Sequence, residues 1–140
     1  MDELHFPDFY IVGAPKCGTT TLYSYLTQSG LVSMLRKEIH YFGQDLQFNR
    51  PRVSLDHYLD ECRKTKPENS NTHLIGDASV YYLRSSSAAR EIFECNPKAK
   101  IIICLRNPVD FMHSLHAQLL ANADETERDF ETALSLESIR

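Results

Sequence analysis

The chain has 140 residues, of which 42% are hydrophobic and 24% are charged, and its formal net charge is −4. This composition is ordinary for a soluble globular domain, and the negative charge argues against nucleic acid as a partner. The four cysteines, at positions 17, 62, 95 and 104, have neither the paired spacing of a zinc site nor that of a disulfide framework, so we expect no metal. No apolar stretch is long enough for a membrane segment.

The first predicted strand, residues 9–12, leads into a loop with a glycine at each end, GAPKCG at residues 13–18. Apolar residues at helical spacing then predict a helix over about 19–28. Open amides at the start of that helix, together with Lys16, predict an anion site. The two glycines have the separation seen in the Walker loop, but Thr19 stands where the Walker lysine belongs. We therefore interpret the loop as a site for a single 5′ phosphate group rather than for a nucleoside triphosphate.

The middle of the chain alternates predicted strands and helices. Strands are predicted at about 31–35 and 74–76, helices at 54–65 and 86–95, and a polar surface loop at 64–72. Two segments with charged and aromatic side chains follow the two strands, RKEIHYF at residues 36–42 and GDASVYYL at residues 76–83.

A continuous apolar run over residues 100–105 predicts a strand buried on both faces at the centre of a parallel sheet. An N-cap asparagine followed by proline predicts that a helix begins next, over 108–122. Arg106 would then lie at the carboxyl end of a strand, where open α/β sheets bind ligands. Its guanidinium can bind a phosphate through two hydrogen bonds, and the Ser114 hydroxyl can add a third.

These elements predict an α/β fold with an open, mainly parallel sheet and helices on both faces. We expect a single domain over residues 1–140. The last predicted helix, an amphipathic one in the stretch 129–140, ends without a clear cap, and we expect the domain to be incomplete at its carboxyl end.

Four blocks, in this order along the chain, resemble the sulfotransferases that use 3′-phosphoadenosine 5′-phosphosulfate (PAPS). Residues 13–26 resemble their 5′-phosphosulfate loop, and residues 101–114 resemble their 3′-phosphate motif. Residues 36–42 are similar to the K-E-x-H-F-F element of the branch that sulfates carbohydrates, including the heparan sulfotransferases, and residues 76–83 to its G-E-x-[ST]-P-x-Y-[FL] block. The resemblance implies the P-loop NTPase-like sulfotransferase fold.

The resemblance also implies a donor site, carried over position by position. The 5′-phosphosulfate would be bound by Lys16, Cys17, Gly18, Thr19 and Thr20, and the 3′-phosphate by Arg106 and Ser114. Lys16 would also stabilise the negative charge that grows on the departing phosphate oxygen. The chain departs from the heparan-type pattern at Ala78, where many members have lysine, and at Val80, where proline is common.

Sulfuryl transfer needs a base that takes the proton of the acceptor. Glu38 corresponds to the glutamate of the K-E-x-H-F-F element, and cationic neighbours on the chain would keep it ionised. His40 is the alternative base. If this stretch is extended, residues 38 and 40 point the same way and both line one wall of a cleft.

The expected function is therefore transfer of a sulfuryl group from PAPS to a hydroxyl or amine of a small-molecule or carbohydrate acceptor. Two alternatives stay open: a P-loop small-molecule kinase, for which the lysine is misplaced, and a non-catalytic nucleotide-binding domain of the same fold. The first ten residues lack the layout of a secretory signal, which favours a cytoplasmic protein. Since Golgi members of the family carry an amino-terminal anchor, the Golgi lumen is the alternative location.

Overall fold

The computed structural model describes residues 5–65 and 74–137. Its elements, in chain order, are β1 (Phe9–Gly13), α1 (Thr19–Ser29), β2 (Val32–Met34), α2 (Leu55–Thr65), β3 (Leu74–Ala78), the 3₁₀ helix η1 (Tyr82–Arg84), α3 (Ala88–Cys95), β4 (Lys100–Ile103), α4 (Pro108–Ala121) and α5 (Phe130–Leu136). The chain divides into two compact units, residues 1–105 and residues 106–140, and each is described by itself.

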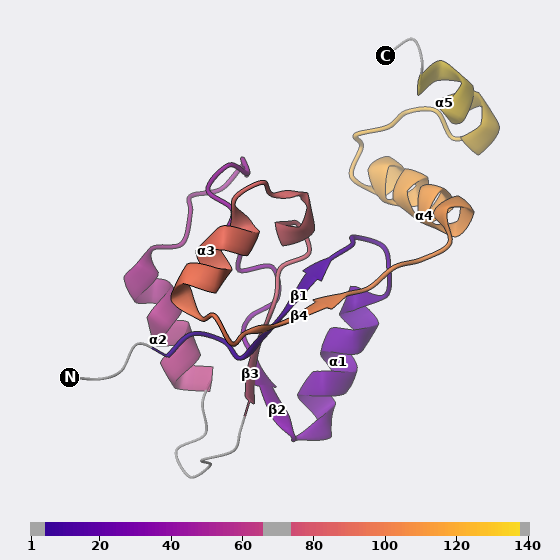
Figure 1. The fold of residues 1–140 in the computed structure, drawn as a ribbon. Helices are drawn as coiled ribbons and strands as arrows, with labels where there is room; N and C mark the ends of the chain where they lie inside the picture. Colours follow the sequence, from indigo (N-terminus) through magenta and orange to yellow (C-terminus); the bar gives the residue numbers. More distant parts are fainter. Residues whose placement is uncertain (1–4, 66–73, 138–140) are drawn as a thin grey trace. The chain divides into compact units, whose positions relative to one another are not determined.

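The first unit is built on a four-stranded sheet in the order β2-β3-β1-β4, in which every pairing is parallel. Figure 1 shows α1 on one face of this sheet and α2 and α3 on the other. The prediction of an open parallel sheet with helices on both faces is therefore confirmed. Tyr10 pairs with Asp77, and Ile11 with Ala78, so β1 and β3 end side by side at the carboxyl edge of the sheet.

The alternation of side chains along β1 explains the two layers of helices. Tyr10 and Val12 point into a core that α2 and α3 complete with Tyr58 and Ile92. Phe9 and its neighbour two residues on, Ile11, point into a second core that is covered by α1. Because a strand sends successive side chains to opposite faces, a strand that is apolar at every position requires a helix on each side.

Most predicted elements lie within two residues of their observed bounds, and the predicted asparagine cap is present. The Ser54 hydroxyl accepts a hydrogen bond from the His57 amide (3.3 Å), and the Asn107 side chain accepts one from the Val109 amide (2.9 Å). Most of the predicted surface loop at 64–72 lies outside the described residues. So do residues 138–140, at the end of the predicted last helix, whose described part is α5.

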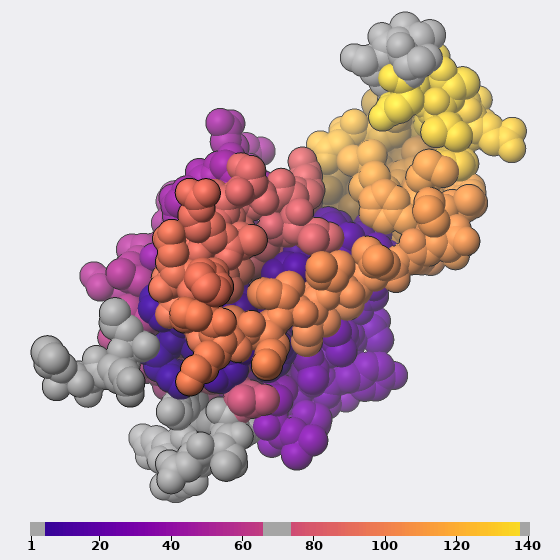
Figure 2. All heavy atoms as spheres, in the orientation of Figure 1, coloured from indigo at the N-terminus to yellow at the C-terminus, as the bar shows by residue number. Residues whose placement is uncertain are grey.

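The prediction of a central, doubly buried strand at residues 100–105 is wrong. Within residues 5–65 and 74–137, β4 pairs with β1 alone and lies at the edge of the sheet, and Ile101 and Ile103 are each about half exposed (50% and 51%). In Figure 2 this part of the chain runs in orange across the visible surface of the first unit. A continuous apolar run indicates that both faces of a strand are apolar. It does not indicate how many strands pair with that strand.

The second unit consists of α4, α5 and their connection. The His116 ring lies with Nε2 2.8 Å from the Glu127 carbonyl oxygen, and the His113 ring packs against Phe130 with centroids 3.9 Å apart.

Within residues 5–65 and 74–137, no helix is both long enough and apolar enough to cross a bilayer.

Candidate active site

The predicted phosphate loop, residues 13–18, connects β1 to α1. Hydrogen bonds to the segment after β4 hold its base: the Ala14 amide donates to the Cys104 carbonyl (2.9 Å), and the Cys104 amide donates to the Gly13 carbonyl (2.7 Å). Lys16 and Gly18 both adopt left-handed backbone conformations, with φ of 60° and 82°. Turns of this kind direct successive backbone amides into a concavity that suits an anion.

The start of α1 is open to a ligand. Gly18 is the N-cap and has no side chain to satisfy the first amides, and the first helical hydrogen bond runs from the Leu22 amide to the Gly18 carbonyl (3.0 Å). The amides of residues 19–21 therefore point out of the helix end, where the helix dipole is positive. Thr19 is buried and Thr20 exposed, whereas Lys16 and Cys17 are half-buried.

Val80 joins this loop to the predicted base. A β-carbon on Gly13 would lie 2.7 Å from the Val80 carbonyl oxygen, and the φ of Gly13 is 146°, so only glycine fits there. The amide of the same residue, Val80, donates to Oε2 of Glu38 at 3.2 Å. The start of the phosphate loop and the Glu38 carboxylate thus lie on either side of one residue of the turn after β3.

Glu38 and His40 do come together, but not through an extended strand. Both residues have left-handed backbones, with φ of 59° and 51°, so the condition that residues 36–42 are extended is not met. The Glu38 amide donates to the Ala78 carbonyl (2.9 Å), which ties this turn to the end of β3. Nε2 of His40 lies 2.9 Å from Oε2 of Glu38, within reach of a shared proton, although the ring is not oriented for a regular hydrogen bond.

Arg50 determines the tautomer of the His40 ring. Its Nη2 lies 2.9 Å from Nδ1 of His40 and also donates to the Glu38 carbonyl. A guanidinium can only donate, so Nδ1 must be the acceptor, and the neutral ring carries its proton on Nε2. Nε2–H therefore faces Glu38, and neither ring nitrogen has a lone pair available to a substrate.

The buried carboxylate of Asp77 supports the backbone of the turn that carries Glu38 and His40. Asp77 accepts hydrogen bonds from the hydroxyls of Tyr58 (2.8 Å), Tyr82 (3.0 Å) and Ser79 (2.7 Å). The Ser79 hydroxyl in turn accepts from the His40 amide (3.1 Å), and the Tyr82 hydroxyl accepts from the next amide, that of Tyr41 (3.0 Å). Burial raises the pKa of Asp77, although three hydroxyls donate to its carboxylate.

The electrostatic surroundings keep Glu38 ionised. Burial alone would raise its pKa, but the hydrogen bonds from His40 and Lys37 and the charge of Lys37 outweigh burial, and the pKa of Glu38 is lowered. The Lys37 ammonium lies 2.8 Å from Oε1. A carboxylate held in this way stays ready to accept a proton across the neutral pH range.

Arg106 and Ser114 belong to the second unit, whereas the other predicted site residues belong to the first. Arg106 is exposed, three residues beyond the end of β4, and Ser114 is half-buried on α4. Their pairing with the phosphate loop stays a prediction. Among the described residues, no group of three or more histidine, cysteine or acidic side chains is placed to hold a metal ion.

Sequence reasoning gave no role to Arg50, Tyr58, Asp77, Ser79 or Tyr82. Three of them stand in the GDASVYYL block, so the block itself was the available signal. Arg50 had no local signal, because it reaches Glu38 and His40 from a loop without regular structure ten or more residues along the chain.

The fold and these contacts define an α/β protein with a glycine-bounded loop before a helix N-terminus and an ionised carboxylate, both at the carboxyl edge of a parallel sheet. Residues 6–138 match the sulfotransferase domain family, and the chain belongs to that family. A crystal structure of a sulfotransferase from Alicyclobacillus acidocaldarius superposes with a TM-score of 0.79 at 32% identity, covering 96% of this chain and 57% of that one.

Two curated relatives with sequence similarity to the chain are also sulfotransferases. The human bifunctional heparan sulfate N-deacetylase/N-sulfotransferase 2 is 31% identical over 120 residues, which are 84% of this chain and 13% of the relative. The membrane-associated sulfotransferase kil1 of Dictyostelium discoideum is 32% identical over 109 residues, 76% of this chain and 22% of the relative. The chain thus spans less than a quarter of the length of either relative.

Proposed function

We propose that this protein transfers a sulfuryl group from PAPS to a hydroxyl or amine of a carbohydrate acceptor, with Glu38 as the general base. The observation that carries the proposal is the position of Val80. Its amide binds the Glu38 carboxylate, and its carbonyl packs against the first glycine of the phosphate loop. A donor held by the loop would therefore present its sulfuryl group close to Glu38.

The loop suits one phosphosulfate group. The open amides of residues 19–21 and the positive end of α1 supply hydrogen bonds and partial charge, and the glycine at Gly18 leaves the helix end free of a side chain. We assign Lys16, Cys17, Thr19 and Thr20 to the same group. Arg106 and Ser114 are proposed to bind the 3′-phosphate, which ATP lacks, so a site built for that group would leave polar side chains unpaired with ATP.

In the reaction, the acceptor oxygen or nitrogen forms a bond to sulfur while the bond from sulfur to the 5′-phosphate oxygen breaks. Glu38 takes the proton that the acceptor loses. The electron pair of the broken bond stays on the phosphate oxygen, where the Lys16 ammonium stabilises it more strongly than in the ground state.

We assign His40 a positioning role and not that of the base. Both of its ring nitrogens are engaged, Nδ1 by Arg50 and Nε2 by Glu38, and its side chain is 4% exposed. The close approach of Nε2 to Oε2 favours the charged form of Glu38 and limits the positions that the carboxylate can take.

A transfer assay on the intact protein tests the function. The protein is incubated with PAPS and with glucosamine-containing oligosaccharides, either with free amines or N-acetylated, and the products are analysed by mass spectrometry. We expect the mass of a sulfuryl group to be added to one of these acceptors, and adenosine 3′,5′-bisphosphate to raise the melting temperature.

Other results would favour the alternatives. Thermal stabilisation by ATP with Mg²⁺ but not by the bisphosphate would support the small-molecule kinase. Stabilisation by the bisphosphate without transfer to a wider acceptor panel would support a non-catalytic nucleotide-binding domain.

A further inference from the structure

One guanidinium nitrogen joins the two left-handed residues of the turn that carries the proposed base. Nη2 of Arg50 donates to the Glu38 carbonyl and lies 2.9 Å from Nδ1 of His40. A positive φ is unfavourable for residues other than glycine, and φ is 59° at Glu38 and 51° at His40. The two contacts of Arg50 therefore support a backbone conformation that local propensity disfavours.

The loop that carries Arg50, residues 43–52, is itself held in place. The Gly43 amide donates to the Glu91 carboxylate (2.6 Å), and the Asp45 carboxylate accepts from the Ser86 amide (2.8 Å). Both partners lie at the start of α3 or just before it. Arg50 is thus presented to the Glu38 turn from a segment with its own attachment to the first unit.

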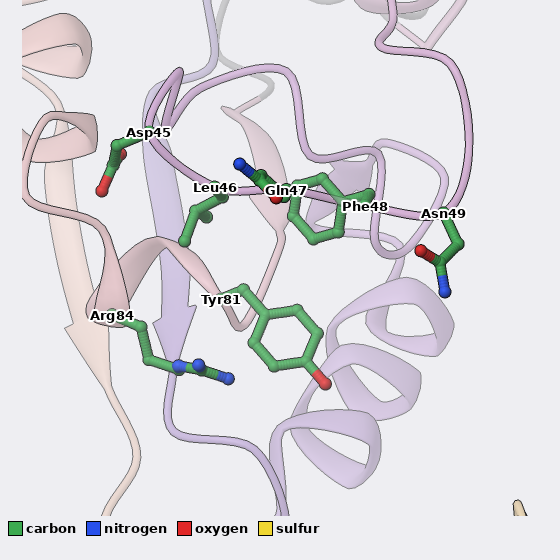
Figure 3. A pocket seen from close by; sticks show the side chains of 7 residues that line it. All are labelled: Asp45, Leu46, Gln47, Phe48, Asn49, Tyr81 and Arg84. Atoms are coloured by element: carbon green, nitrogen blue, oxygen red, sulfur yellow. The ribbon is translucent and has the colours of Figure 1, made fainter.

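Aromatic side chains pack around the His40 ring. Figure 3 shows Phe48, from the loop, and Tyr81, from the residue before η1, with their rings toward each other. Their centroids lie 4.5 Å and 5.4 Å from that of the imidazole, and the Arg50 guanidinium lies over Phe48, 5.9 Å from its centroid. Because the His40 side chain is only 4% exposed, its ring cannot turn over without displacing these neighbours.

The two tautomers of the His40 ring would act on Glu38 in opposite ways. With Arg50 donating to Nδ1, the proton of the neutral ring lies on Nε2, which is 2.9 Å from Oε2 of Glu38. In the other tautomer a lone pair on Nε2 would face Oε2, and the contact would be favourable only if Glu38 carried a proton. A carboxylate that is already protonated cannot take the proton of an acceptor.

Resting on the proposed function, we propose that Arg50 is a positioning residue that keeps Glu38 ionised through the His40 ring. It acts at Nδ1, whereas the carboxylate lies beside Nε2. Among the described residues, the titratable side chains that face this carboxylate are His40 and Lys37, whose ammonium lies 2.8 Å from Oε1. A substitution of Arg50 leaves Lys37 in place, so the tautomer of the ring reports what Arg50 contributes.

NMR spectra of the intact protein, isotope-labelled at the histidine ring nitrogens, test this role without any transfer reaction. Two-bond correlations between ring protons and ring nitrogens distinguish the tautomers, and His40→Asn identifies the signals of His40. In mildly alkaline solution we expect the wild-type ring to be protonated at Nε2. Arg50→Met cannot donate and should show a population protonated at Nδ1, whereas Arg50→Lys should keep the wild-type tautomer.

The transfer assay then connects the ring to the base. Arg50→Met should lower turnover by about tenfold and leave the affinity for adenosine 3′,5′-bisphosphate unchanged. The pKa of Glu38 rises when the contact with a protonated Nε2 is lost, so the acidic limb of the rate profile should move to higher pH. Arg50→Lys should restore both. A fall in turnover with an unmoved acidic limb would reduce Arg50 to a support of the loop and overturn the proposal.

Two control variants separate the contact with the ring from the stability of the loop. Arg63→Met, on the exposed side of α2, should alter nothing. Arg52→Met removes an arginine of the same loop that donates to the Gly43 and Leu46 carbonyls rather than to the imidazole, and it should keep the wild-type tautomer.

An unchanged tautomer in a folded Arg50→Met variant, or the same change of tautomer in Arg52→Met, would overturn the role of Arg50. If the tautomer depends on Arg50 but the wild type sulfates no acceptor, the error lies in the proposed reaction and not in the contact with the ring.

Discussion

The phosphate loop and the turn that carries Glu38 meet at the same edge of the sheet, but they are held in opposite ways. The loop is held by backbone hydrogen bonds, such as those between Ala14 and Cys104. The Glu38 turn is held by side chains that come from elsewhere in the chain, chiefly Arg50 and the group around Asp77.

The two regions should therefore respond differently to mutation. Binding by backbone amides survives most side-chain changes, so in the loop only the lysine and the glycines are sensitive positions. The Glu38 turn depends on a chain of side-chain contacts, each of which can be removed singly.

Glu38→Gln should separate the two regions most sharply. The amide cannot take the acceptor proton, so we expect turnover to fall by about a thousandfold. Affinity for adenosine 3′,5′-bisphosphate should stay unchanged, because the loop does not use this side chain. Steady-state kinetics and calorimetry measure the two effects, with Glu94→Gln on the exposed side of α3 as the control. Unchanged turnover would remove Glu38 from the role of base.

Lys16→Ala should affect both binding and turnover. Loss of the ammonium removes a contact to the donor and stabilisation of the leaving oxygen, and we expect turnover to fall by about a hundredfold with weaker donor binding. The exposed Lys98→Ala serves as the control. Weaker binding with full turnover at saturating donor would limit Lys16 to donor binding.

Asp77→Asn tests whether the Glu38 turn depends on the buried carboxylate. An amide cannot accept from all three hydroxyls, and we expect the free energy of unfolding to fall by about 2–4 kcal/mol in urea denaturation. Asp60→Asn, which breaks only the exposed pair with Lys64, should leave stability almost unchanged. Similar stability of the two variants would contradict the role of Asp77 as the support of this turn.

His40→Asn should give the smallest effect, about a tenfold loss of turnover, because it disturbs the orientation of Glu38 without removing it. Asparagine tolerates the left-handed backbone at this position. The wild-type rate should fall only when the pH drops through the lowered pKa of Glu38. Without the contact from His40 that pKa rises, so the acidic limb of the profile should move to higher pH.

The exposed His57→Asn is the matched control for that shift. An acidic limb that stays in place in His40→Asn would show that the imidazole does not act on the carboxylate. Complete loss of turnover would instead restore His40 as a candidate for the base.

The difference between the two regions also decided what could be predicted from the sequence. The start of α1 was predictable because its first contact joins neighbours in the chain, Gly18 and Leu22, whereas the hydrogen bonds from the loop to Cys104 had no local signal. The proximity of Glu38 and His40 was expected from an extended segment, but two left-handed residues in a turn bring them together. The GDASVYYL block marked Asp77, Ser79 and Tyr82 as a group, but not their hydrogen bonds, which also reach Tyr58 on α2.

The error at β4 has a related cause. A run of apolar side chains reports the chemistry of both faces of a strand, and those faces are properties of the strand itself. The number of neighbouring strands is a property of the whole sheet. The strand order, which the run cannot report, gives β4 one partner, β1, in the part of the chain that the structure describes.

The tyrosines around Asp77 have a practical consequence. Burial raises the pKa of Tyr10, Tyr58 and Tyr82 well above the ordinary value, so in the native state their phenols keep their protons in alkaline solution. Unfolding exposes them, and each then ionises and absorbs ultraviolet light at longer wavelength. Because the chain has no tryptophan to mask that signal, tyrosine absorbance in alkaline solution reports directly on unfolding of the core beneath Glu38.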